Sequence, residues 1–345
     1  MSISGLALKS RCTSPIVNHT VFKGARPRFL PGTLLSMKIK ILGSAAGGGF
    51  PQWNCNCPNC RDLRNDAPNV TGRTQSSIAV STNGQDWLLV NASPDILQQI
   101  RNNPELQPAR HIRDTGIAAI LLTDAQIDHV TGLLMLREHA RPWPIYATPS
   151  VWHDLSTGFP IANLLSHYCG VEHRRLDTDG QPVGGLDFLD QVRITPVPLK
   201  SKAPPYSPNR TQGKVGDNIG LLIENLRSGK RVFYAPGLGE VEPAIRQHMQ
   251  QADLVLVDGT LWAEDEMIRL GLSGKKSSDM GHLALSGTGG MIEVLDSLGD
   301  GTRTPRKVLV HINNSNPVLR HDSPERATLQ RHNIEVAEDG MVFEV

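Results

Sequence analysis

The stretch "TDAQIDHVTG", Thr123 to Gly132, follows the apolar residues 120–122 and leads into the apolar residues 133–136. This pattern predicts a buried strand, a tight loop and a helix. Asp128 and His129 are adjacent in the loop, so that a carboxylate and an imidazole can reach one metal ion from the end of a strand. The stretch therefore predicts a metal site at one edge of a sheet.

Three residues elsewhere in the chain are candidates to complete this site. "ADLVLVDG" places Asp258 at the end of a very apolar strand, and "RKVLVHINN" places His311 at the end of another. His282, in "DMGHLALSG", precedes a predicted helix and is a candidate general acid or base, or a support for the metal ligands. We expect the metal ligands to be Asp128, His129, Asp258 and His311, and the catalytic side chains to be His282 and Asp128.

The motif "CNCPNC" indicates a second metal site. Cys55, Cys57 and Cys60 place three thiols within six residues, in a loop rich in Pro and Asn that is poor core material. Zinc takes four N or S ligands in structural sites, so the motif predicts structural zinc with a fourth ligand from elsewhere. The alternative is a group of buried thiols. Clustered cysteines favour metal over disulfides, which indicates a reducing, cytoplasmic location.

Candidate strands and helices are interleaved along the chain without a fixed repeat. The candidate strands are Lys38–Gly43, Ser77–Thr82, Asp86–Asn91, Ala118–Leu122, Pro144–Ala147, Val192–Pro196, Ile219–Glu224, Arg231–Tyr234, Leu254–Asp258 and Val308–Ile312. Ile334–Val336 and Met341–Val345 are predicted to form a hairpin around Asp339-Gly340. Helical patterns follow Ser93 and cover Thr131–His139, Pro160–Cys169, Pro243–Gln251 and Ser286–Leu298. The class is therefore α/β, with mixed sheets in a four-layer α/β/β/α sandwich.

Residues 37–345 are predicted to form one domain. Residues 1–36 contain five Lys or Arg and no Asp or Glu, and the first strand begins beside Met37. We interpret residues 1–36 as a non-native or disordered extension; a transit peptide is the alternative. The net charge of +1 gives no overall electrostatic attraction to nucleic acid. No apolar run approaches the length of a membrane span.

The stretch "PLKSKAPPYSPNRTQGKVGD", residues 198–217, has no periodicity and is rich in Pro, Lys and Arg. A loop this long inside a domain is usually functional or disordered. It is expected to form either a wall of the active site or a mobile surface loop.

The motifs "SAAGGGFPQWNCNCPNC", "TDAQIDHVTGLL", "SKAPPYSPNR", "VDGTLW", "MGHLALSG" and "HINNSNP" occur in the order typical of one family. From Met37 onward the chain resembles the pyrroloquinoline quinone (PQQ) biosynthesis protein B family of the metallo-β-lactamase superfamily. The resemblance implies the α/β/β/α sandwich and places the superfamily metal ligands on the four residues given above. In related phosphodiesterases, the fourth zinc ligand lies three residues after the last active-site histidine. That residue is Asn314 here, and His321 is the alternative.

Hydrolases of the superfamily carry T-H-x-H-x-D-H, whereas this chain has Asp124 and Gln126 in place of the first two histidines. Those histidines bind the first of the two metals in such a hydrolase. Without that metal, the ligands that remain for a single metal are His129, His311 and either Asp258 or Asp128. Two histidines and one carboxylate are the ligands of non-heme Fe(II) oxygenases, although zinc accepts the same ligands. The resemblance implies iron-dependent hydroxylation of the tyrosine ring in a cross-linked Glu–Tyr precursor of PQQ.

Such a precursor carries several carboxylates, so cations and a tyrosine on the long loop are expected to bind it: Lys200, Lys202, Tyr206, Arg210 and Lys214. A carrier that moves PQQ or its precursor toward the periplasm, and a metal-dependent hydrolase, are the alternatives. A homodimer and contacts with other enzymes of the pathway are further expectations.

Overall fold

The first sheet begins where the alternation of apolar residues begins, at β1 (Lys38–Gly43). The computed structural model describes residues 36–299 and 303–345, so the prediction for residues 1–36 lies almost entirely outside it. The sheet has seven strands in the order β13-β1-β2-β3-β4-β5-β6. The remaining strands are β2 (Ser77–Ser81), β3 (Trp87–Val90), β4 (Ile117–Leu121), β5 (Trp143–Ala147), β6 (Val171–Arg175) and β13 (Val342–Glu344). Pairing is antiparallel from β13 to β3 and parallel from β3 to β6.

The second sheet has six strands in the order β12-β11-β10-β9-β8-β7. They are β7 (Val192–Pro198), β8 (Ile219–Asn225), β9 (Arg231–Ala235), β10 (Leu254–Asp258), β11 (Arg306–Val310) and β12 (Ile334–Val336). β9 to β12 are parallel, whereas β7, β8 and β9 pair antiparallel. Both sheets are therefore mixed, as predicted.

Alternation along each strand divides the apolar residues between two layers. In β10, Leu254 and Leu256 pack in the core between the sheets, whereas Val255 and Val257 pack under the outer helices. In β3, Leu88 and Val90 face the other sheet, and Leu89 faces outward. All residues of both strands are buried, which explains their continuous apolar runs.

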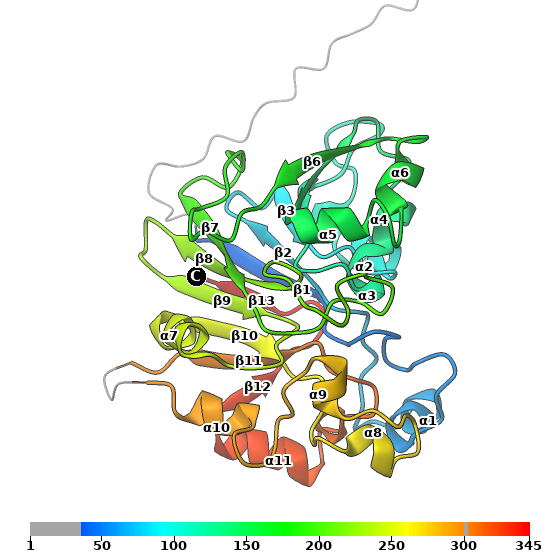
Figure 1. Cartoon of the computed structure of the whole chain (residues 1–345), viewed down its shortest axis with the longest axis vertical. Coiled ribbons are helices and arrows are strands. Elements are labelled where there is room, and N and C mark those ends of the chain that lie inside the picture. The colour runs from blue at the N-terminus through cyan, green and yellow to red at the C-terminus, as the bar shows by residue number, and fades with distance from the viewer. Residues whose placement is uncertain (1–35, 300–302) are drawn as a thin grey trace, which may run out of the picture. The chain divides into compact units, whose positions relative to one another are not determined.

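Helices cover the outer face of each sheet and complete the predicted four layers (Figure 1). Over the first sheet lie α2 (Ile96–Asn102), α4 (Gly132–Met135), α5 (Pro149–Asp154) and α6 (Ile161–Leu165). Over the second lie α7 (Pro243–Gln251), α10 (Met291–Asp296) and α11 (Pro324–Arg331). The shorter helices are α1 (Pro58–Arg64), α3 (Ile127–Val130), α8 (Glu266–Arg269) and α9 (Ser277–Met280). In residues 36–299 and 303–345, no helix has the length and apolar character needed to cross a membrane.

The hairpin predicted around Asp339-Gly340 is wrong. β12 pairs with β11 in the second sheet, and β13 pairs with β1 in the first, so the turn carries the chain from one sheet to the other. The Asp339 carboxylate explains this crossing. Oδ1 accepts hydrogen bonds from Ser44 N and Oγ at 2.9 and 2.8 Å, and Oδ2 accepts from Thr74 N and Oγ1 at 2.7 and 2.8 Å.

Other differences from the predicted elements are local. The helix predicted over Thr131–His139 is instead divided into α3 and α4, which begin and end earlier. β6 was missed because it is an edge strand of mostly polar residues with little burial, and it shows no apolar alternation.

Asp339→Asn is expected to destabilise the fold. An amide presents N–H groups to donors that now bond a carboxylate oxygen, so the free energy of unfolding should fall by about 1–3 kcal/mol. Urea denaturation of this variant and of Asp187→Asn, an exposed control, measures the effect. An equal decrease of the free energy of unfolding in both variants would contradict the role assigned to Asp339.

Candidate metal centre

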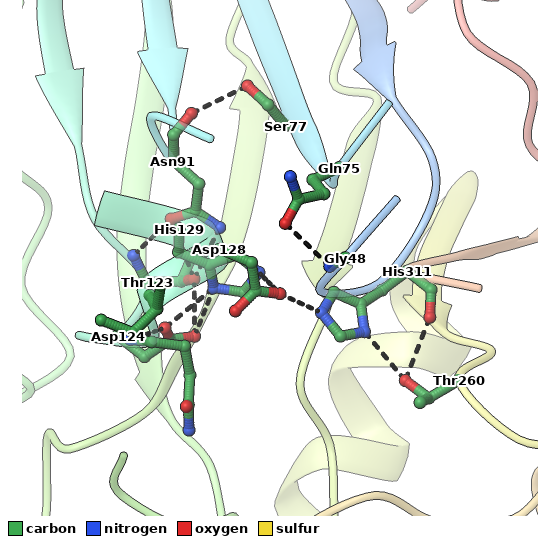
Figure 2. A network of polar contacts seen from close by, with 12 residues as sticks. Gly48, Gln75, Ser77, Asn91, Thr123, Asp124, Asp128, His129, Thr260 and His311 are labelled. Atoms are coloured by element: carbon green, nitrogen blue, oxygen red, sulfur yellow. Dashed lines mark hydrogen bonds and ion pairs between the residues drawn. The ribbon is translucent and has the colours of Figure 1, made fainter. Parts of the chain in front are cut away.

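The ends of three strands bring the predicted ligands together, and Figure 2 shows three of them: Asp128, His129 and His311. Asp124 follows β4 and α3 carries Asp128 and His129, while Asp258 is the last residue of β10. His311 follows β11 directly and has a φ of 58°, a left-handed backbone that turns the chain out of the strand. The predicted strand Val308–Ile312 therefore ends earlier, at Val310.

Close packing fixes the helix that carries two of these residues. A Cβ on Gly132 would lie 2.2 Å from Ser93 O and 2.7 Å from Ala92 O, so only glycine fits there. Backbone hydrogen bonds join Ala92 N to His129 O at 2.7 Å and Gly132 N to Ala92 O at 2.9 Å. These contacts hold α3 against the end of β3 and thereby direct Asp128 and His129 inward.

The two ring nitrogens of His129 have different surroundings. Nδ1 lies 2.8 and 2.9 Å from the two carboxylate oxygens of Asp124. Nε2 is buried and has no hydrogen-bond partner. A carboxylate that receives Nδ1–H leaves the Nε2 lone pair free for a metal, as in many metal-binding histidines. The unpartnered Nε2 therefore fits a metal ligand.

His311 is held in a similar way by a hydroxyl. Its Nδ1 lies 2.8 Å from Thr260 Oγ1, which donates its own proton to Asp258 Oδ1 at 2.6 Å. The hydroxyl can also donate to His311 O at 3.0 Å. With its one proton given to either acceptor, its oxygen accepts from His311 Nδ1–H, which leaves the lone pair on Nε2. That Nε2 lies 3.2 Å from Asp128 Oδ2. The ligand atoms of Asp128, His129 and His311 all lie within 4.8 Å of one another.

The Asp258 carboxylate is fully occupied by hydrogen bonds. Oδ1 accepts from Thr260 N at 2.9 Å and from Thr260 Oγ1; Oδ2 accepts from Leu238 N at 2.9 Å and faces His282 Nδ1 at 2.5 Å. Asp258, His282 and His311 also have potential ligand atoms within 4.8 Å of one another. Of the two carboxylates that the sequence left open, however, Asp128 is the one with a less engaged oxygen near both imidazoles.

The charges of the group favour a cation. Burial would raise the pKa of Asp128, but His129 and His311 outweigh it and hold that pKa well below its usual range. Burial would lower the pKa of His129, yet Asp124 and Asp128 raise it to about 9. The carboxylates thus draw a proton onto His129, and a divalent cation could replace that proton.

A pocket of about 250 Å³ opens onto the group. Ser201, Pro205 and Arg210 of the long loop line it, so the loop forms a wall of the site. Lys275 lines it from the segment before α9. His282 lines it from the segment after α9, and its ring stacks on that of His311 at 5.3 Å between ring centres.

Of the residues predicted to bind substrate, only Arg210 lines this pocket. Lys200 forms ion pairs with Glu240 and Glu242 at 3.4 and 3.0 Å. Lys202 Nζ donates to Asp279 O at 3.0 Å, and the Tyr206 hydroxyl donates to Ala125 O. These three side chains therefore fix the position of the loop. Lys214 is exposed and does not line the pocket.

The residues that replace histidines of related hydrolases each form structural hydrogen bonds. Asp124 orients His129, as described above. Gln126 Nε2 donates to Lys202 O at 3.0 Å. Asn209 lies in the long loop and is buried. Its Nδ2 donates to Ser150 Oγ and Asp217 Oδ1, both at 3.1 Å. These side chains position His129 and the long loop.

The three thiols of the cysteine motif form a second group, with Sγ atoms within 4.8 Å of one another. Asn314 Nδ2 lies 3.1, 3.6 and 3.3 Å from the Sγ atoms of Cys55, Cys57 and Cys60. His321 instead faces Glu338, with 3.5 Å between Nε2 and the carboxylate. Burial and the neighbouring thiols raise the pKa of Cys57 to about 12. A cation would stabilise the thiolates, so the three thiols fit zinc. Of the two candidates for the fourth ligand, Asn314 is the one beside the thiols, and its amide donates N–H to the sulfurs.

Thr260 and Lys275 were missed in the sequence. Thr260 stands two residues after the strand-end Asp258, a spacing from which a hydroxyl can reach that carboxylate, so a signal was present. No sequence signal distinguishes Lys275, because Lys276 beside it is also a lysine in the same context.

Comparisons with known proteins agree with this architecture. Residues 86–312 match the beta-lactamase superfamily domain. The chain is 60% identical over 303 residues to coenzyme PQQ synthesis protein B of Cupriavidus necator, across 88% of this chain and 98% of that protein. A protein of the same name from Azoarcus sp. is 58% identical over 309 residues, across 89% of this chain and 99% of the relative.

Two solved structures share the fold. Zn²⁺-bound PqqB from Methylobacterium extorquens has a TM-score of 0.79 and 38% identity, with coverage of 89% of this chain and all of that one. A diphosphatase of the PhnP family, at a TM-score of 0.62 and 17% identity over 90% of this chain and 98% of its own, shows the fold alone. The superfamily domain matches, and the alignments cover almost the whole length of the relatives. The chain therefore belongs to the coenzyme PQQ synthesis protein B family, which acts in PQQ biosynthesis.

Proposed function

We propose that the chain is a mononuclear Fe(II) oxygenase that hydroxylates the tyrosine ring of the cross-linked Glu–Tyr precursor of PQQ. The observation that carries the proposal is the unpartnered, buried Nε2 of His129, which lies in one group with His311 and Asp128. Two imidazoles and one carboxylate leave metal positions open for O₂ and substrate. When bound, Fe(II) would supply the one-electron chemistry that O₂ requires.

The other side chains of the pocket have separate roles in this proposal. Arg210 and Lys275 line the pocket and bind carboxylates of the precursor. Asp258 holds Nδ1 of His282, so that His282 Nε2 is the atom that exchanges a proton with the substrate. One oxygen atom of O₂ enters an aromatic C–H bond. The other oxygen atom takes up two protons and two electrons from an external reductant and leaves as water.

A dinuclear hydrolase is less well supported, because it needs a second metal beside the first. In place of the histidines that hold that metal in related hydrolases the chain has Asp124 and Gln126, and each is already engaged in the hydrogen bonds described above. A carrier would bind the precursor without changing it.

The function is tested by oxygen dependence. The iron-loaded protein, the precursor and ascorbate are mixed with ¹⁸O₂, and the product is analysed by mass spectrometry. One ¹⁸O atom per hydroxylation and no product under argon are expected. Turnover under argon would indicate the hydrolase, and stoichiometric binding without product would indicate the carrier.

His311→Ala should abolish iron binding and hydroxylation together, because it removes one of the two imidazole ligands. His282→Ala should keep the iron but lose about 100-fold or more in turnover, because general acid–base groups contribute on that scale. Iron content after anaerobic loading and single-turnover rates measure both, and circular dichroism confirms folding. Full iron in His311→Ala, or no iron in His282→Ala, would contradict these assignments.

Lys275→Ala should raise KM for the precursor about tenfold with little change in kcat, because one charge-assisted hydrogen bond to a carboxylate is lost. Lys276→Ala is the matched control, since Lys276 is equally exposed but does not line the pocket. Steady-state kinetics under fixed O₂ distinguishes them. An unchanged KM in Lys275→Ala would exclude this lysine from substrate binding.

A further inference from the structure

The cysteine motif contains a buried polar side chain that is not a thiol. Asn59 lies in α1 between Cys57 and Cys60 and is only 4% exposed. Its Nδ2 donates two hydrogen bonds, to Asn314 O at 3.0 Å and to Asn316 O at 2.9 Å. Both amide protons are thus used to hold carbonyls of one distant segment, residues 313–316.

That segment leads directly back to the metal centre. It begins two residues after His311, and Asn313 N donates to Thr260 O at 3.0 Å. Asn316 Nδ2 donates to Gly259 O at 2.9 Å and to Thr260 O at 3.3 Å. Residues 313–316 are therefore fixed on one side by Asn59 and on the other by the backbone of Thr260, whose hydroxyl bonds His311 Nδ1.

His311 needs such support more than most residues. A left-handed φ in a residue other than glycine costs roughly 1 kcal/mol or more and persists only where the surrounding structure enforces it. Without Asn59, and within the described part of the chain, Asn316 O would keep only the backbone donor Leu319 N at 3.2 Å, and Asn314 O only the Cys57 Sγ contact at 3.7 Å, which a thiolate bound to metal cannot make. Loss of the two bonds from Asn59 would thus loosen the segment that enforces this backbone.

We propose that Asn59 is a positioning residue for the active-site metal, and that through it the occupied cysteine site holds His311 in its ligating orientation. A metal on Cys55, Cys57 and Cys60 fixes the start of α1, Asn59 fixes residues 313–316, and these fix His311. Occupation of either metal site then favours occupation of the other, because such coupling is reciprocal.

The test uses Asn59→Asp, Asn59→Ala and the control Asn65→Asp, which makes the same change at an exposed position just after the same helix. The cysteine site is kept loaded with zinc, the active site is stripped with a chelator, and Co(II) is titrated anaerobically. Zinc binds such ligands more tightly than Co(II) and stays in place. Zinc content, Co(II) affinity and the visible Co(II) d–d bands are recorded.

Both Asn59 variants should keep zinc, bind active-site Co(II) about 10–100-fold more weakly and show altered d–d bands. Asn65→Asp should match the wild type. Wild-type Co(II) affinity and spectra in the Asn59 variants would overturn the positioning role. Loss of zinc from both would also overturn it, because the role requires Asn59 to act with zinc in place.

The inference rests on the metal centre proposed above, and the two can fail separately. A wild-type protein that binds no Co(II) outside the cysteine site would overturn the metal centre and the inference with it. If the wild type binds Co(II) with the same affinity and the same d–d bands as both Asn59 variants, the inference alone is overturned.

Discussion

The hydroxyl of Thr260 is the interaction on which the site depends. It donates to Asp258, accepts from His311 and lies 3.1 Å from His282 Nδ1. One oxygen atom thereby sets the orientation of side chains from the end of β10, the residue after β11 and the segment after α9. Because the hydroxyl proton goes to Asp258 or to His311 O, the hydroxyl oxygen accepts from His311 Nδ1–H, and this leaves the lone pair on the Nε2 that faces Asp128. A single short side chain thus determines which nitrogen is available to a metal.

Two side chains beside His129 differ from those of hydrolases with this fold. At the two positions where hydrolases of the superfamily carry histidines, Asp124 contacts His129 Nδ1 and Gln126 donates to Lys202 O. A buried carboxylate beside His129 makes its Nε2 a better ligand, since it accepts the Nδ1 proton. Fold and reaction are therefore separable: the sandwich supplies the converging strand ends, and a few polar side chains decide what binds there.

The fold also joins two sites that the chain separates widely. The cysteine motif and residues 313–316 are more than 250 positions apart, yet Asn59 and Asn314 make them neighbours. His311 and Asn314 lie on one short turn after β11, so a change at the thiols has a direct route to the metal centre. A buried structural metal in this position would act on the reaction through backbone geometry.

The sequence alone determined the class of fold, most strand positions and the two sets of candidate ligands. It could do so because apolar alternation, strand ends and the spacing of Cys55, Cys57 and Cys60 are local patterns. Only the tertiary structure decided which carboxylate stands near the imidazoles, which loop cations face the pocket, and which sheets β12 and β13 join. Asp128 and Asp258 look equally suitable in the chain; their difference arises from the hydrogen bonds that Leu238, Thr260 and His282 make to Asp258. Such contacts join residues from separate elements, and no local pattern encodes them.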